Sequence, residues 1–378
     1  MKSYTGFLKG TILVFLFILS FTAVEAASGE VEVTPLLDTP GNRVYYNHLI
    51  EAVSAAEKSI SVMMSTAENY PKHPGGIQSD LFDALGSAAD RGVVVRVLLD
   101  ESDFSSSITE TNKKTAELLR DHGLKVKLDD PEVTTHAKLV VIDERITIVG
   151  SSNWNYPSYT DTYQSNVELS SREVGGFYSR VFDAVWSGES LEKIKLPELS
   201  RGETIVPLIS TGENRSYFSV AKEMIERAQE SINLVVFKIT RYPEFRNSKS
   251  NQLLKALVQA NERGVELKIV LDVNTWSDDV NRSNRETALW LLGQGVEKVS
   301  FDSLNTTTHS KVLIVDGNSV LVGSTNWSYY SLSKNLEADI LIQGSPGIGS
   351  AYRRYFEELW KKADVPNRKE LSGNLDGE

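Results

Sequence analysis

His136-Ala-Lys-Leu-Val-Val-Ile-Asp143 is followed, after six further residues, by Gly150-Ser-Ser-Asn153. The same arrangement returns as His309-Ser-Lys-Val-Leu-Ile-Val-Asp316 and, again after six residues, Gly323-Ser-Thr-Asn326. In each copy the His and the Lys are two residues apart, so on an extended strand their side chains point to the same face. Four apolar residues follow the Lys, which is typical of a strand buried on both faces. The sequence therefore predicts an imidazole and an ammonium group side by side at the head of a core strand, twice.

The similarity of the two halves extends well beyond these motifs. Ser59-Ile-Ser-Val62 matches Ser231-Ile-Asn-Leu234, and Asp90-Arg-Gly-Val93 matches Glu262-Arg-Gly-Val265, both at a separation of 172 residues. Such a constant register over about 150 residues indicates a duplicated unit.

Each unit alternates predicted strands with predicted helices, which favours an α/β fold. We expect two duplicated α/β sandwich lobes with mixed sheets flanked by helices. The lobes should pack about a pseudo-twofold axis, with the active site between them. The predicted boundaries are an N-terminal lobe at residues 31–186, a linker at 187–202, a C-terminal lobe at 203–365 and a flexible tail at 366–378.

The composition excludes several classes of protein. The 378 residues carry a formal net charge of −11, which argues against nucleic-acid binding through bulk electrostatics. The chain contains no cysteine, so disulfides, thiolate nucleophiles and Cys-ligated metals are excluded. A few local Lys or Arg side chains can still serve a single phosphate.

The first residues have the pattern of a secretion signal. Lys2 and Lys9 precede an apolar run from Thr11 to Val24, and small residues lie at Val24 and Ala26. The run is shorter than the roughly 20 residues that span a bilayer. We therefore expect residues 1–26 to be a cleaved signal peptide, and the protein to be secreted, periplasmic or on the cell surface. An uncleaved membrane anchor is the alternative.

The duplicated motif has the functional groups for chemistry at phosphorus. Imidazole serves as a nucleophile or as a general acid near neutral pH, and His136 and His309 can divide these roles. A phosphate anion is the natural occupant of a site between two ammonium groups. The predicted phosphate ligands are Lys138, Lys311, Asn153, Asn326, Ser151 and Ser324.

The repeated carboxylates leave more than one interpretation. Asp143 and Asp316 either pair with a nearby base at the active site or begin the turn to the next strand. Asn166-Val-Glu168 and Asn335-Leu-Glu337 form another repeated pattern. A carboxylate against a His ring nitrogen fixes its tautomer, so Glu168 and Glu337 are predicted to orient the two His rings.

The string His-x-Lys-x4-Asp-x6-Gly-Ser-x-Asn, present twice, resembles the phospholipase D superfamily. The resemblance covers roughly residues 31–365, and both copies keep every residue of the pattern. It implies a two-step displacement at phosphorus through a covalent phosphohistidine, without a metal or another cofactor. It also implies that His136 is the nucleophile, that His309 is the general acid and base, and that one chain with both motifs acts as a monomer. The near-symmetry of the two copies leaves the reverse assignment open.

The resemblance fixes the substrate less closely than the chemistry. The interpretation preferred from the sequence is a secreted phosphodiesterase of the phospholipase D type that hydrolyses or transfers a phosphatidyl group. The alternatives are a secreted endonuclease acting on DNA or RNA, and a cardiolipin-synthase-like phosphatidyltransferase. The predicted partners are a phospholipid or another phosphodiester, with transient contact to a membrane surface, or nucleic acid for the endonuclease.

Overall fold

The computed structural model describes residues 31–70, 76–102, 105–191, 194, 204–212, 214 and 216–364. The predicted signal peptide, the predicted tail and most of the predicted linker lie outside these residues. Within the described part of the chain, no helix is long and apolar enough to cross a membrane.

The first lobe alternates strands and helices, as the sequence predicts. Its elements are β1 (Glu32–Asp38), α1 (Val44–Ala55), β2 (Ser59–Met64), α2 (Ile77–Asp90), β3 (Val94–Leu99), α3 (Ser106–Asp121), β4 (Lys125–Leu128), β5 (Lys138–Ile142), β6 (Ile146–Gly150), α4 (Tyr156–Thr160), β7 (Thr162–Ser170) and α5 (Arg172–Ser187).

The second lobe repeats this order and adds the short strand β12. Its elements are β8 (Thr204–Ser210), α6 (Ser216–Arg227), β9 (Ser231–Val236), α7 (Lys249–Glu262), β10 (Glu266–Leu271), α8 (Asp278–Gly293), β11 (Val299–Phe301), β12 (Thr307–Thr308), β13 (Lys311–Val315), β14 (Ser319–Gly323), α9 (Tyr329–Ser333), β15 (Glu337–Gln343) and α10 (Pro346–Lys362).

Both sheets are mixed and have matching topology. The first runs β1-β7-β6-β5-β2-β3-β4 and the second β8-β15-β14-β13-β9-β10-β11. The pairs β2–β3, β3–β4, β9–β10 and β10–β11 are parallel, and the other neighbours in these two orders are antiparallel. The fold class expected from the sequence, two duplicated α/β lobes with mixed sheets, is confirmed.

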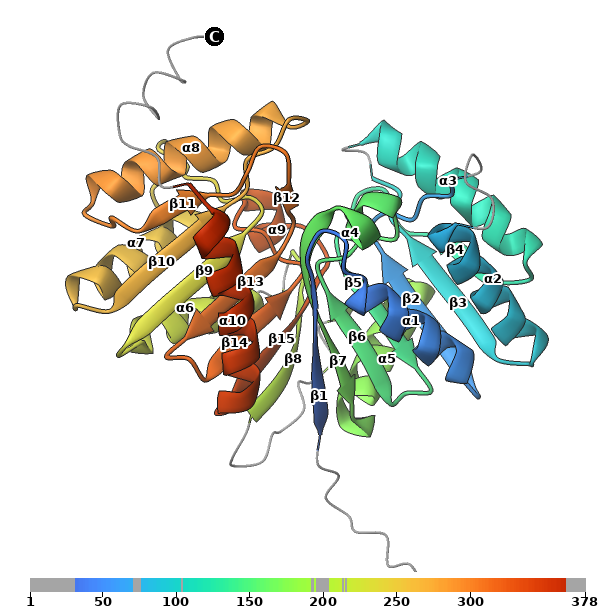
Figure 1. Cartoon of the computed structure of the whole chain (residues 1–378). Helices are drawn as coiled ribbons and strands as arrows, with labels where there is room; N and C mark the ends of the chain where they lie inside the picture. The colour runs from blue at the N-terminus through green and yellow to red at the C-terminus, as the bar shows by residue number, and fades with distance from the viewer. Residues whose placement is uncertain are drawn as a thin grey trace, which may run out of the picture. The chain divides into compact units, whose positions relative to one another are not determined.

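The described residues form three apolar cores, one in each lobe and one between the lobes. One core packs α1, α2 and α3 against the outer face of the first sheet, and another packs α6, α7 and α8 against the second sheet (Figure 1). The third core joins the lobes, because α5, α10 and the inner faces of both sheets contribute to it. A shared core of this kind fixes how one lobe faces the other, and therefore fixes any site built from both.

Backbone hydrogen bonds across the lobes position each motif His. The His136 N–H donates to the Leu336 carbonyl at 2.9 Å, and the His309 N–H donates to the Tyr163 carbonyl at 2.9 Å. Each His is therefore held by the residue that precedes Glu337 or Gln164 in the opposite lobe. The pseudo-twofold symmetry expected from the repeat appears here as a pair of reciprocal contacts.

Candidate active site

The motif strands β5 and β13 lie in the middle of the two sheets. Each motif Lys is the first residue of its strand and pairs with the last residue of β2 or β9. His136 and His309 therefore lie where the parallel strands of each lobe end. We call this side of both sheets, with the carboxyl ends of β2, β3, β9 and β10, the histidine edge.

His136 faces a carboxylate from the other lobe. Its Nδ1 lies 2.8 Å from Oε2 of Glu337, the first residue of β15. The Glu337 side chain is fully buried. The Ser324 hydroxyl donates to the same oxygen at 2.6 Å, and the Asn335 amide donates to Oε1 at 3.1 Å. Because Nδ1 faces a carboxylate, it carries the proton, and Nε2 keeps its lone pair for chemistry.

The His136–Glu337 pair is electrostatically stable despite its burial. Burial alone raises the pKa of Glu337, but His136, the charge of Lys138 and the hydrogen bond from Ser324 together outweigh burial and hold that pKa below its usual value. Burial lowers the pKa of His136, and the charge of Glu337 opposes this effect. Glu337 therefore stays ionised and stabilises any positive charge that develops on the His136 ring.

His309 faces a neutral amide instead. Its Nδ1 lies 3.2 Å from Oε1 of Gln164, whose oxygen also accepts from the Ser151 hydroxyl at 2.6 Å. Burial and the charges of Lys311 and Lys138 hold the pKa of His309 well below its usual value. The two motifs, nearly identical in sequence, thus place their imidazoles in different electrostatic environments.

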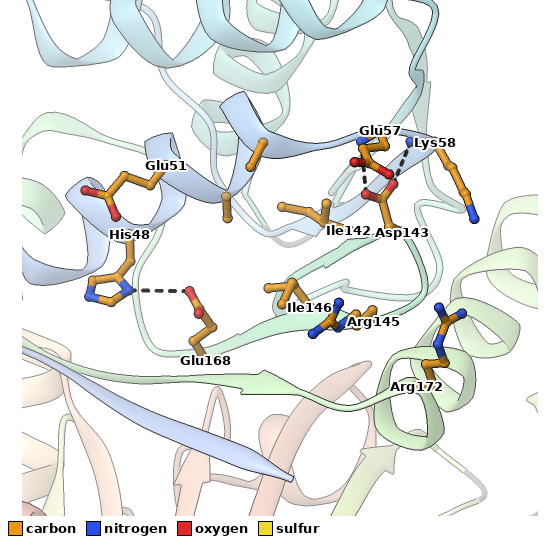
Figure 2. Close-up of a pocket in the computed structure, with 12 residues that line it drawn as sticks. His48, Glu51, Glu57, Lys58, Ile142, Asp143, Arg145, Ile146, Glu168 and Arg172 are labelled. Atoms are coloured by element: carbon orange, nitrogen blue, oxygen red, sulfur yellow. Dashed lines mark hydrogen bonds and ion pairs between the residues drawn. The ribbon is translucent and has the colours of Figure 1, made fainter. Parts of the chain in front are cut away.

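Glu168 does not have the position that the sequence predicts for it. Gly150 pairs with Asn166 as Gly323 pairs with Asp339, so Gln164 is the structural counterpart of Glu337. Glu168 lies four residues further along β7 and contacts His48 at 3.5 Å (Figure 2). Side chains four residues apart on a strand share one face but are about 13 Å apart, which explains why the repeated Asn-x-Glu pattern misled.

Asp143 and Asp316 lie far from the His side chains, at the opposite ends of β5 and β13. Asp143 accepts the backbone N–H groups of Glu57, Lys58 and Ser59 at 2.7 to 2.9 Å (Figure 2). Asp316 accepts the corresponding three N–H groups in its lobe. The prediction of a catalytic Asp is corrected to the turn-forming alternative, because each Asp follows its His by seven positions along an extended segment and therefore lies about 20 Å from it.

Ser151 and Ser324 support the partners of the His rings and not a phosphate. Both are fully buried, and both hydroxyls also accept a backbone N–H, from Ser165 at 2.9 Å and from Ala338 at 3.1 Å. With a donor and an acceptor already engaged, these hydroxyls fix Gln164 and Glu337 in place. Their prediction as phosphate ligands is corrected accordingly.

Asn153 lies in the same pocket as His309. Asn153 lines a pocket of about 510 Å³ together with His309 and Gln164, and its buried Oδ1 has no partner among the described residues. Asn326 accepts from the Lys238 N–H at 3.3 Å. The Asn153 amide is therefore placed to meet a ligand in the pocket that contains His309.

Lys138 and Lys311 are buried cations, and nearby carboxylates only partly offset the effect of burial on their pKa values. Each is 2% exposed, and each ammonium donates to the carbonyl of its own motif His. Burial lowers the pKa of Lys138 to about 8 and that of Lys311 well below its usual value, and the charge of Lys138 lowers the latter further. Two buried, mutually repelling ammonium groups beside two His rings favour an anion between them.

Two further repeated pairs support the site, and the sequence analysis did not assign them. Asp100 and Asp272 accept the N–H of the residue preceding each motif His, Thr135 at 2.7 Å and Thr308 at 2.6 Å. Burial raises the pKa of Asp100 to about 7 and that of Asp272 to about 6. Their spacing of 172 residues, the same as in the rest of the repeat, was the available signal.

The second pair is Asn112 and Asn284, which lie in helices α3 and α8 at the same spacing. Each amide nitrogen donates to two backbone carbonyls, one just after each of two neighbouring strands. Each amide oxygen accepts a backbone N–H from the loop that follows β2 or β9. These amides hold the histidine edge in shape.

The motif tryptophans, Trp154 and Trp327, are fully buried and belong to the core. Within the described residues, no group of three or more His, Cys, Asp or Glu is placed to hold a metal ion.

A family model described as "Cardiolipin synthase, PLD-like domain" matches residues 49–186 and 221–360. The chain belongs to this family and so to the phospholipase D superfamily. Similar curated proteins are cardiolipin synthase A of Edwardsiella ictaluri (26% identical, over 80% of this chain and 64% of the relative) and of Erwinia tasmaniensis (27%, 85% and 68%). The chain thus spans about two thirds of the length of these relatives.

Solved structures share the fold at low sequence identity. Phosphatidylserine synthase of Haemophilus influenzae has a TM-score of 0.66 at 12% identity, covering 89% of this chain and 88% of its own. Polyphosphate kinase of Porphyromonas gingivalis has a TM-score of 0.56 at 16% identity, covering 87% and 46%. At these identities the likeness concerns the fold alone.

The relatives correct two expectations from the sequence. They are cardiolipin synthases, so the preferred interpretation as a hydrolase is less well supported than the phosphatidyltransferase alternative. They also contradict the expectation of a secreted, periplasmic or cell-surface protein, because these relatives are cardiolipin synthases. Action on a phosphodiester by phospholipase D-type chemistry is supported at the level of the superfamily.

Proposed function

We propose that the protein is a phosphatidyltransferase of the cardiolipin-synthase type. It would move a phosphatidyl group from one phospholipid to the hydroxyl group of an acceptor, such as the glycerol of a phosphatidylglycerol molecule. The observation that carries the proposal is the pair of His side chains with unlike partners, Glu337 and Gln164, on either side of two buried lysines. The family model and the names of the relatives support a lipid acceptor over water.

In the first step His136 attacks phosphorus. Its Nε2 lone pair forms the P–N bond while the bond from phosphorus to the leaving alkoxide oxygen breaks. The ring gains positive charge as the bond forms, and the Glu337 carboxylate at 2.8 Å from Nδ1 stabilises that charge. The same carboxylate makes His136 the better nucleophile of the two, because an amide at Gln164 gives His309 no such stabilisation.

His309 supplies the proton in this step. A general acid must be protonated, whereas burial and the two lysines lower the pKa of free His309. A phosphodiester bound between the lysines adds negative charge and offsets their repulsion, which raises that pKa when substrate is present. His309 then protonates the leaving oxygen, and the product alcohol departs.

In the second step the reaction runs back with a new alcohol. Neutral His309 accepts the proton of the acceptor hydroxyl, whose oxygen attacks phosphorus and breaks the P–N bond to His136. Lys138 and Lys311 balance the charge of the phosphate oxygens in both steps, with the amides of Asn153 and Asn326 beside them. Transfer and hydrolysis differ only in whether an alcohol or water occupies the acceptor position.

The test is a product assay on phosphatidylglycerol with a chelator present. Cardiolipin and free glycerol are expected as products, separated by chromatography and identified by mass. His136→Ala should abolish both products, whereas Glu168→Gln, a conservative change at a carboxylate outside the site, should leave them unchanged. Phosphatidic acid as the sole lipid product, together with free glycerol, would move the assignment to a hydrolase. Cleavage of single-stranded DNA without lipid turnover would move it to a nuclease.

A further inference from the structure

Large hydrophobic side chains on the surface are concentrated at the histidine edge. In the described part of the chain, the exposed ones at this edge are Val133, Tyr156, Phe245, Trp276, Leu304, Tyr329 and Tyr330. Val94, at the start of β3, is exposed at the opposite edge. Single exposed hydrophobic residues are ordinary, but a concentration on one face indicates an interaction surface.

Several of these side chains line one groove in the second lobe. A groove of about 970 Å³ lies between the segment that joins β9 to α7 and helix α9. Four aromatic residues line it: Tyr242, Phe245, Tyr329 and Tyr330. The Tyr242 hydroxyl accepts the Tyr329 N–H at 2.8 Å, which joins the two walls. Phe245 is 69% exposed, so its ring stands in solvent at the rim.

The segment between β9 and α7, which forms one wall of the groove, also contacts the second motif. Lys238, in the segment between β9 and α7, donates its N–H to Asn326 at 3.3 Å and accepts the Trp327 N–H at 3.0 Å. Helix α9 begins two residues after Trp327. The two segments that form the walls of the groove therefore both begin next to Asn326, a residue of the second motif.

The charge of the groove is opposite to that of the chain. Its lining contains Arg246, Lys249 and Lys334 and a single carboxylate, Glu244. The chain as a whole carries a net charge of −11. A local excess of cations beside aromatic rings complements an anionic partner with apolar parts.

A second group of aromatic residues, Trp276 and Phe237, lies next to His309. Trp276 is 64% exposed, and its ring stacks on that of Phe237 with 5.8 Å between the ring centroids. The Phe237 ring meets the His309 ring edge-on, with 4.8 Å between their centroids. Leu304 and Trp276 line the same pocket as His309. Exposed apolar groups therefore border the pocket that contains His309 as well as the groove.

We propose that this surface docks onto a bilayer containing anionic phospholipid, with the groove and Trp276 at the level of the headgroups. We call it the aromatic face and define it by Phe245, Trp276, Tyr329, Tyr330, Arg246 and Lys334. Trp and Tyr carry an apolar ring with a polar end and favour the membrane interface, while Arg and Lys are attracted to anionic headgroups. The inference rests on the proposed function, because a phosphatidyl donor resides in a bilayer.

Binding to vesicles tests the docking without requiring any turnover. Full-length protein is mixed with vesicles of phosphatidylcholine and phosphatidylglycerol, or of phosphatidylcholine alone, and the bound fraction is measured by flotation. Phe245→Ser with Tyr330→Ser should weaken binding roughly tenfold through lost apolar contact. Arg246→Gln and Lys334→Gln should each weaken it about fivefold on the mixed vesicles only. Val94→Ser and Arg172→Ala, at the opposite edge, are the matched controls.

The outcomes separate the docking from the chemistry. Reduced vesicle binding by the face variants, with normal thermal unfolding and normal turnover of a short-chain phosphatidylglycerol in free solution, supports the proposal. Equal binding by the face and control variants, or no binding by the unmodified protein, overturns it. A change in oligomeric state of the face variants without vesicles would assign the surface to a second copy of the chain. Vesicle binding without any lipid turnover would leave the docking intact and reject the proposed function.

Discussion

Replacing Glu337 by glutamine removes one negative charge from the site and keeps the size and shape of the side chain. Glu337 is fully buried, and its Oε2 accepts from both His136 and Ser324. The first lobe already contains the result of such a change, because Gln164 accepts from Ser151 and faces His309 in the same way. The variant protein is therefore expected to fold normally.

The magnitude follows from the hydrogen bond that is weakened. A bond to an ionised partner contributes about 1.5–3 kcal/mol and a neutral bond about 0.5–1.5 kcal/mol. The carboxylate contributes most in the transition state, where the His136 ring becomes positive, so most of the difference falls on the rate. We expect Glu337→Gln to slow formation of the phosphohistidine roughly ten- to hundredfold.

Rapid mixing with excess enzyme measures this step directly. The covalent intermediate is quenched with base, digested, and located by mass spectrometry on the peptide containing His136 or His309. The matched variant is Gln164→Glu, which gives His309 a carboxylate and raises its pKa. In the double variant that combines Glu337→Gln with Gln164→Glu, the trapped phosphatidyl group should shift from His136 towards His309. A wild-type intermediate on His309, or an unchanged rate in Glu337→Gln, would refute the assignment of roles.

Three further predictions concern charge and packing. Because the pKa of Lys138 is about 8, its charge is present below that pH and lost above it; inorganic phosphate, measured by calorimetry, should bind more weakly above about pH 8, and Lys138→Met should remove this dependence. Asp143→Ala should lower the free energy of unfolding by about 2 kcal/mol through its lost bonds to backbone N–H groups, without reducing phosphate binding. The pKa of Asp143 is lowered in the folded state, because the backbone N–H bonds outweigh the effect of burial, so the contribution of Asp143 should persist above about pH 4 and disappear below it, as urea unfolding would show. Gly323→Ala places a Cβ against the Asp339 carboxylate and should destabilise the protein by about 3 kcal/mol, whereas Gly347→Ala, with open space around its Cβ, should be close to neutral in thermal unfolding.

Helix starts show how local signals limit what a sequence predicts. Most apolar residues of α3 and α8 follow Asn112 and Arg285, but the two helices begin at Ser106 and Asp278. Each first turn contains a single apolar residue, Ile108 or Val280, and follows a Ser whose hydroxyl accepts the N–H of that residue. The caps were visible in the sequence, yet periodicity alone does not detect a turn with one apolar residue.

The sequence by itself determined the duplicated α/β fold and the identity of the central groups. The spacing of His and Lys by two residues places both on one face of a strand whatever surrounds them, and the repeat places that pair in both lobes. The tertiary structure alone decided which side chain meets which His. Side chains on a strand return to the same face every two residues, so a local pattern does not distinguish Gln164 from Glu168. The pairing of neighbouring strands and the contact between the lobes select Gln164 for His309 and Glu337 for His136.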